Sequence, residues 1–147
     1  MTYDEMIIAV ANLTHESFFD IYRKANNGSR VKTTIDKDWI EKHGTDQADL
    51  ARLEYYELPT DWQKERWSGA KIALDTLLKI VKLGKPLDGE FVEYASDIIH
   101  EEWLPRNMDR AKDYHKLPYA ELSDFQKEKD RIFARAAIDI YQKNKLE

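Results

Sequence analysis

The run YYELPTDWQKER at residues 55–66 returns later in the chain as YAELSDFQKEK at residues 119–129. Tyr, Glu, Leu, Asp, Gln, Lys and Glu are identical in the two runs once Pro59 is treated as a one-residue insertion. A shorter match precedes each run, because His15-Glu16-x-Phe18 resembles His100-Glu101-x-Trp103. Self-similarity of this kind predicts a duplicated structural unit.

Each unit is expected to be a helix ending in His-Glu-x-aromatic, a connector, a Tyr-x-Glu-Leu turn and a second helix. We assign the first unit to residues 1–83, with an inserted connector at 29–54, and the second to residues 84–147. Two copies of one helical hairpin are expected to pack with pseudo-twofold symmetry as one compact unit. The seam between them is the expected place for a ligand.

Composition and helix signals predict a folded, mainly all-α chain. The 147 residues are 42% hydrophobic and include only 5 Gly and 4 Pro, which excludes a disordered chain. Three capping boxes, at Thr2–Glu5, Thr60–Gln63 and Ser123–Gln126, are predicted to open helices. The aromatic residue two positions after each of the last two caps is expected to enter the core.

Four long helices are expected. They are residues 3–24, Thr60 to about Leu83, Glu90 to Leu104 with Pro105 as the stop, and a helix after Ser123.

The inserted connector is expected to contain short helices. Asp36 is predicted to cap one that ends at Lys42-His43-Gly44, and Thr45-Asp46 to begin another that Leu58-Pro59 ends. The segments 30–35 and 113–117 are expected to form a short β pairing.

Charge and cysteine usage narrow the classes of function. The net charge is −5, from 23 basic and 28 acidic residues spread evenly over both halves, which argues against a nucleic acid polymer as partner. The absence of Cys and of a long apolar segment predicts a cytoplasmic protein with no membrane association. We expect no cofactor, no metal and no catalytic residue, because familiar enzyme motifs do not occur.

The second unit resembles the ryanodine-receptor-type repeat, or RyR domain. The resemblance is carried by Ala95-x-x-Ile98-Ile99-His100-Glu101-Glu102-Trp103, by Leu117-Pro118-Tyr119-Ala120-Glu121-Leu122, and by Gln126-Lys127-Glu128-Lys129-Asp130-Arg131. The first unit resembles it more loosely, and the family's Gly-Trp-x-Tyr-Gly signature is absent from both. The resemblance implies a tandem pair of RyR-type hairpins, as in the ion-channel family, where these repeats are cytosolic and non-catalytic. Small bacterial and phage proteins with this domain are similar in size, and for the prokaryotic members the resemblance implies a ligand of nucleotide type.

The connectors and helix ends combine basic and aromatic residues in the manner of a site for a phosphorylated ligand. Guanidinium and ammonium groups hold phosphate oxygens, and Tyr or Trp rings stack on a base. The predicted ligand-binding residues are Arg30, Lys32, Arg106 and Arg110 for phosphate, Tyr22, Tyr55, Trp103 and Tyr119 for stacking, and His15, His100 and Asn107 for hydrogen bonding.

The leading hypothesis is therefore a non-enzymatic module that senses or sequesters an ADP-ribose-derived or cyclic nucleotide ligand, for instance as a phage sponge for a defence signal. One alternative is a protein-interaction module that uses the long helices or residues 29–54, and a homodimer through the last amphipathic helix is compatible with either. Another alternative is a nucleotide hydrolase with a metal-dependent carboxylate cluster. The two His-Glu pairs do not by themselves predict a zinc site, since adjacent helical side chains diverge by about 100°.

Overall fold

The computed structural model describes residues 1–24 and 28–144, and it confirms the predicted mainly α-helical fold class. The helices and strands are α1 (Tyr3–Lys24), β1 (Val31–Thr33), α2 (Lys37–His43), β2 (Gln47–Asp49), α3 (Thr60–Lys82), α4 (Gly89–Asn107) and α5 (Asp124–Asn144). Three single-turn 3-10 helices complete the described part of the chain: η2 (Tyr55–Glu57), η3 (Asp113–Lys116) and η4 (Tyr119–Glu121). The prediction of a first helix at residues 3–24 is confirmed.

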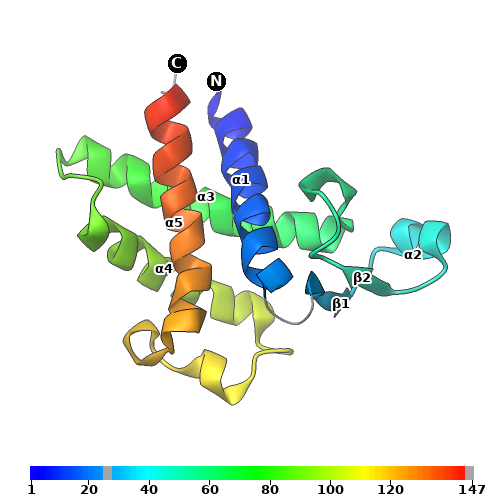
Figure 1. Ribbon diagram of the computed structural model, residues 1–147. Helices are drawn as coiled ribbons and strands as arrows, with labels where there is room; N and C mark the ends of the chain where they lie inside the picture. The colour runs from blue at the N-terminus through cyan, green and yellow to red at the C-terminus, as the bar shows by residue number, and fades with distance from the viewer. Residues whose placement is uncertain (25–27, 145–147) are drawn as a thin grey trace.

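The four long helices pack around one core (Figure 1). Helices α1 and α5 lie side by side, with the start of α1 and the end of α5 at the same end of the molecule, and α3 crosses behind them. The segment with β1, α2 and β2 projects to one side. Within residues 1–24 and 28–144, no helix has both the length and the apolar character needed to cross a membrane.

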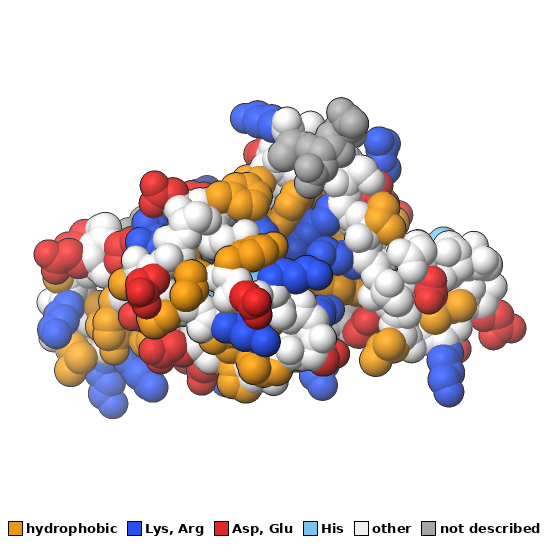
Figure 2. Space-filling model, turned by 90° about the horizontal axis from the view of Figure 1, so that it is seen from below, with side chains coloured by type: hydrophobic (Ala, Val, Ile, Leu, Met, Phe, Trp, Pro, Cys, Tyr) orange, Lys and Arg blue, Asp and Glu red, His pale blue; other side chains and the backbone are white. Residues whose placement is uncertain are grey.

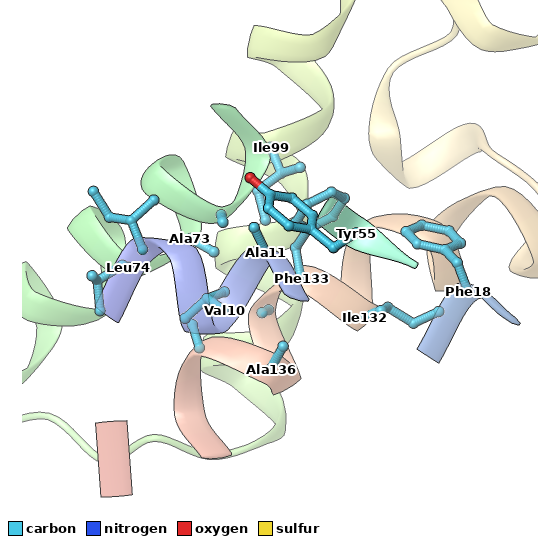
Figure 3. Close-up of a cluster of buried hydrophobic side chains, with 14 of the residues drawn as sticks. Val10, Ala11, Phe18, Tyr55, Ala73, Leu74, Ile99, Ile132, Phe133 and Ala136 are labelled. Carbon is cyan, nitrogen blue, oxygen red and sulfur yellow. The ribbon is translucent and has the colours of Figure 1, made fainter. Parts of the chain in front are cut away.

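Apolar stripes of these helices meet in the core (Figure 3). Val10, Leu74 and Ile99 are at most 2% exposed and come from three different helices. Helices α3 and α5 approach closely at Gly69, where an added Cβ would lie 2.6 Å from the Phe133 ring. A glycine at this position therefore sets the distance between the two helices.

The helix starts confirm part of the capping prediction. Thr2 and Glu5 form the expected box, because each backbone N–H donates to the other's side chain. Ser123 Oγ accepts from the Gln126 N–H at 3.3 Å. At α3 the prediction was wrong, since Pro59 is the N-cap residue and Thr60 already lies inside the helix.

The start of helix α3 and the end of helix α4 also differ from the sequence prediction. The Gln63 side chain donates to the carbonyls of Tyr56 and Leu58 instead of accepting from the N–H of a cap residue, and this ties the preceding turn to the helix. Helix α4 passes through Pro105 and ends at Asn107. The Arg106 and Asn107 side chains donate to the carbonyls of Glu102 and Trp103 at 2.7 and 2.9 Å, which supplies hydrogen bonds to the last turn.

The predicted helix after Thr45 is absent, because residues 47–49 form β2. This strand pairs antiparallel with β1, with Lys32 opposite Ala48, so the predicted pairing with residues 113–117 was wrong as well. Asp49 fixes the pairing by accepting from the Arg30 N–H at 2.9 Å and from the Ser29 hydroxyl at 2.7 Å. The helix from Asp36 to Gly44 is confirmed, with Asp36 accepting from the Trp39 N–H.

Each of the two sequence units contains an equivalent hydrogen bond from its histidine to a backbone carbonyl. His15 Nε2 bonds the Leu53 carbonyl at 2.6 Å, and His100 Nε2 bonds the Leu117 carbonyl at 2.8 Å. Each carbonyl belongs to the residue two positions before the Tyr of a Tyr-x-Glu-Leu turn, and each turn is a 3-10 helix. Matched sequence positions thus make the same contact in both units.

Candidate functional site

A cavity of about 350 Å³ opens where the end of α1, β1, α3, the end of α4, η3 and the start of α5 meet. Figure 2 shows the face onto which it opens, with Lys and Arg side chains gathered in a hollow beside hydrophobic side chains. Matched residues of the two sequence units line the same cavity. These pairs are Phe18 and Trp103, Trp62 and Phe125, and Arg66 and Lys129.

Positive charge dominates the lining. Seven cationic side chains line the cavity, and they come from both sequence units and from the connector of each. They are Arg30, Lys32, Arg66, Arg106, Arg110, Lys112 and Lys129. Two acidic side chains, Glu65 and Asp130, lie among them. A positive cavity therefore sits inside a chain whose net charge is −5.

Glu65 neutralises one of the seven cations. Its Oε1 accepts from Arg106 Nη2 and from Asn107 Nδ2, both at 3.0 Å. Burial raises the pKa of Glu65, but the hydrogen bonds from Arg106 and Asn107 outweigh this and hold the pKa below its ordinary value. The Asn107 Oδ1 then accepts two hydrogen bonds from the Arg110 guanidinium, one of them from Nε at 2.8 Å.

Asp130 contributes little negative charge at neutral pH. Burial raises the pKa of its carboxyl to about 8, although the neighbouring Lys129 acts in the opposite direction. Burial also lowers the pKa of Lys129 to about 8, with Arg30 and Lys32 adding to the effect. Near pH 7 Lys129 is therefore mostly charged and Asp130 mostly neutral, which leaves the cavity strongly positive.

Three guanidinium groups cover aromatic rings inside the cavity. The Cζ atom of Arg30 lies 4.4 Å from the centre of the Tyr22 ring, that of Arg66 4.2 Å from Phe18, and that of Arg110 4.3 Å from Trp62. Such cation–π contacts hold a guanidinium group in place without neutralising its charge. All three rings are at most 6% exposed.

A neutral histidine orients Arg66. The Arg66 Nε–H donates to His15 Nδ1 at 3.3 Å, so the proton of His15 is on Nε2, which donates to the Leu53 carbonyl. Burial and the adjacent Arg66 lower the pKa of His15 to about 4. Burial, together with Arg30, lowers the pKa of Arg66 to about 9, which still leaves it charged at neutral pH.

Two hydrogen-bonding groups of the cavity lining have no partner. Arg30 Nη1 and the Tyr22 hydroxyl are both buried, and neither makes a hydrogen bond within the described part of the protein. Tyr22 as a whole is 5% exposed. Unpaired buried polar groups are costly and are typical of sites that are completed by a ligand or by water.

The structure brings seven of the eleven predicted ligand-binding residues to this cavity: Tyr22, Arg30, Lys32, His100, Trp103, Arg106 and Arg110. His15 and Asn107 lie behind the lining and hold Arg66 and Arg110. Tyr55 and Tyr119 do not line it, because both are buried beside their turns, where Tyr119 donates to Glu93 at 3.0 Å.

Several lining residues were missed by the sequence reasoning. Arg66 and Lys129 occupy matched positions of the duplication, and this equivalence is the signal that could have identified them. Phe125 was expected in the core, yet it is 48% exposed and lines the mouth, whereas its counterpart Trp62 is 6% exposed.

The fold and the site define a small, mainly α-helical protein with a cation-rich cavity between its two sequence units. Comparisons of the chain with protein-family models, with curated proteins and with solved structures found no match. Among the residues described, no group of three or more His, Asp or Glu side chains has a geometry suited to a metal ion.

Proposed function

We propose that the protein binds a small phosphorylated, nucleotide-like ligand in the cavity and does not transform it. The observation that carries this proposal is the excess of cations over anions in the lining. Within the described residues, no carboxylate pairs with Arg30, Lys32, Arg66, Arg110, Lys112 or Lys129. Like charges held together in a poorly hydrated place repel one another, and an anionic ligand relieves the repulsion.

The composition of the lining favours a phosphoryl group joined to an aromatic ring. Guanidinium forks match phosphate oxygens, and the aromatic residues of the lining supply apolar contact. The cavity volume falls at the small end of the range of about 300–1,000 Å³ typical of ligand pockets. This size suits a mononucleotide or a ligand of which one part remains outside.

In this proposal the protein is a cytoplasmic RyR-like module that either passes the ligand's signal to a partner or keeps the ligand away from other proteins. A bacterial or phage protein of the second kind would act as a sponge for a nucleotide signal. The proposal rests on the resemblance of the two units to the RyR-type repeat together with the charge of the cavity.

The test is a calorimetric titration with ADP-ribose, NAD, nucleoside mono- and diphosphates, and cyclic nucleotides, after native mass spectrometry has excluded a co-purified ligand. We expect binding at micromolar Kd or tighter, about 8 kcal/mol or more. Arg30→Gln is expected to weaken it at least about tenfold, whereas Arg135→Gln, on the exposed face of α5, leaves it unchanged. The ligand is expected to be recovered intact. Silence across the panel, or turnover of the ligand, would overturn the proposal.

A protein-interaction role is the second candidate, and the projecting segment favours it. Helix α2 has no buried residue, and Val31 and Ile35 beside it are 54% and 80% exposed. Ile35→Asp is expected to abolish the capture of a protein partner in a pull-down, or the self-association of the protein measured by sedimentation. Ligand binding is expected to persist in this variant. Unchanged association in this variant would remove the segment from consideration.

A further inference from the structure

The arrangement of charges and rings within the cavity specifies more than a nucleotide-like ligand. We infer that the ligand enters phosphoryl end first, carries at least two phosphoryl groups, and leaves its planar ring at the mouth against Tyr114 and Phe125. This inference rests on the proposed function and deepens it.

The floor of the cavity offers hydrogen-bond donors that lack acceptors. The Tyr22 hydroxyl and Arg30 Nη1 are buried without partners, and Arg66, 6% exposed, lies within the same group of cations. A guanidinium group can only donate, so it requires an acceptor. A phosphoryl group is such an acceptor, with three terminal oxygens and negative charge.

The aromatic rings at the floor of the cavity are not free to stack on a base. Phe18, Tyr22 and Trp62 already carry the guanidinium groups of Arg66, Arg30 and Arg110 at 4.2–4.4 Å. Stacking a base on these rings would displace cations into a region that is already crowded with positive charge. The floor therefore suits oxyanions rather than a planar ring.

The mouth has the opposite character. Tyr114 in η3 and Phe125 at the start of α5 both line the cavity, and they are 53% and 48% exposed. Lys129 lies 4.9 Å from the centre of the Phe125 ring, which connects this ring to the cationic interior. Half-exposed aromatic rings at the entrance give a base or another planar group an apolar surface to contact.

The number of unpaired cations sets the charge of the ligand. Six of the lining cations have no carboxylate partner among the described residues. One phosphomonoester brings a charge of about −1.5 to −2 at pH 7, whereas a phosphodiester lacks the second ionisation and brings about −1. A terminal diphosphate or a bisphosphate therefore compensates the cavity better than a monophosphate, and a cyclic mononucleotide compensates it least.

The experiment compares inorganic pyrophosphate, orthophosphate, AMP, ADP and cyclic AMP by calorimetry at constant ionic strength. We expect pyrophosphate to bind at least about tenfold more tightly than orthophosphate, and ADP more tightly than AMP and cyclic AMP. Tyr22→Phe removes only the unpartnered hydroxyl, and it is expected to weaken pyrophosphate and ADP by a similar factor. The double variant Tyr114→Ala/Phe125→Ala is expected to weaken ADP about tenfold and to leave pyrophosphate unchanged.

Tyr94→Ala is the matched control, because Tyr94 is 55% exposed and does not line the cavity. It is expected to leave both ligands unaffected, and urea unfolding verifies that each variant folds. Two outcomes would overturn the inference and leave the proposed function standing. One is binding of nucleotides without binding of pyrophosphate, and the other is an affinity that does not increase with the number of phosphoryl groups in the ligand. Equal loss of pyrophosphate and ADP in the double variant would overturn the orientation. No binding of any phosphorylated compound would overturn the proposed function as well.

Discussion

The side-chain amide of Asn107 links Arg106, in the last turn of α4, to Arg110, in the segment after α4: it donates to Glu65, which also binds Arg106, and it accepts from Arg110. It is completely buried, donates to Glu65 and to the Trp103 carbonyl, and accepts from Arg110. All of its polar atoms are thus used, and its position determines where the Arg110 guanidinium lies. A polar residue of this kind serves the site and the fold together.

We predict that Asn107→Ala lowers the free energy of unfolding by about 1–3 kcal/mol, because Arg110 and the Trp103 carbonyl lose their partner. Urea denaturation measures the change, and Gln142→Ala, at an exposed position of α5, is the control. An effect no larger than that of the control would contradict the role given to Asn107. Ligand affinity is expected to fall as well, since Arg110 becomes free to move.

Asp130 makes stability fall as pH rises toward the alkaline side of neutrality. Its pKa is raised by burial from 3.8 to about 8, so between these values the folded state holds a proton that the unfolded state has lost. The unfolding free energy therefore decreases across this window. The pKa of His15 is lowered from 6.5 to about 4, so this residue makes the unfolding free energy rise with pH between these two values. Above pH 6.5 it adds no further pH dependence.

Between pH 6.5 and 8 we expect the wild type to lose stability and Asp130→Asn to lose clearly less. The measurement is urea unfolding at several pH values in this interval, with Asp139→Asn, on the last turns of α5, as the control. Parallel pH profiles for wild type and Asp130→Asn would refute the raised pKa.

At the residue scale, the sequence predicted the cations in and beside the connectors well and the cations inside long helices poorly. Arg30, Lys32, Arg106 and Arg110 suggested a site because they stand in or next to the expected connectors, although the structure places Arg106 in the last turn of α4. Arg66 lies inside a regular helix, where an arginine is ordinarily a solvated surface residue. Its burial depends on how α3 packs against α1, which local sequence does not determine.

At the scale of elements, Gly69 sets the contact between α3 and α5. An added methyl group would lie 2.6–3.0 Å from three ring atoms of Phe133, which is 8% exposed and has little freedom to move. The ring also lines the cavity and packs edge-on against Phe18 at 5.9 Å. Separating the two helices would therefore also change the cavity.

We predict that Gly69→Ala destabilises the protein by about 1–3 kcal/mol, even though alanine favours helix by about 1 kcal/mol over glycine. Gly89→Ala is the matched control, because an added Cβ there meets nothing within 4 Å and α4 begins at this residue. Its expected effect on urea unfolding is neutral or stabilising. A stabilising Gly69→Ala would contradict the close packing of α3 on α5.

Element prediction succeeded where local signals act alone and failed where distant contacts decide. The apolar stripe and the capping box of α1 involve only residues that are close in sequence, and the bounds of this helix were predicted correctly. Residues 47–49 have helix-compatible neighbours, but pairing with β1 and the hydrogen bonds of Asp49 place them in a strand. Thr60 failed as a cap because the preceding Pro59 takes that position.

At the scale of the whole molecule, the duplication places matched residues of both units around one cavity. Arg66 and Lys129, as well as Trp62 and Phe125, face the same space although 63 positions separate each pair in the chain. The cavity thereby collects cations from both units and from both connectors. Without an anion, these cations repel one another inside the fold, and the protein keeps them at a cost to its own stability.

The most direct test of this account is the free energy of unfolding of Lys129→Met in phosphate-free buffer at pH 7. Methionine keeps an unbranched apolar side chain at this position. It removes the ammonium group, whose nitrogen lies 4.9 Å from the centre of the Phe125 ring and 6.0 Å from that of the Tyr22 ring, and with it one charge of the cavity. We expect Lys129→Met to be more stable than the wild type because it removes one of the mutually repelling charges, whereas Lys79→Met, near the end of α3, brings no comparable gain. A Lys129→Met protein that is less stable than both would show that the charge of the cavity is already balanced, and would contradict the central claim.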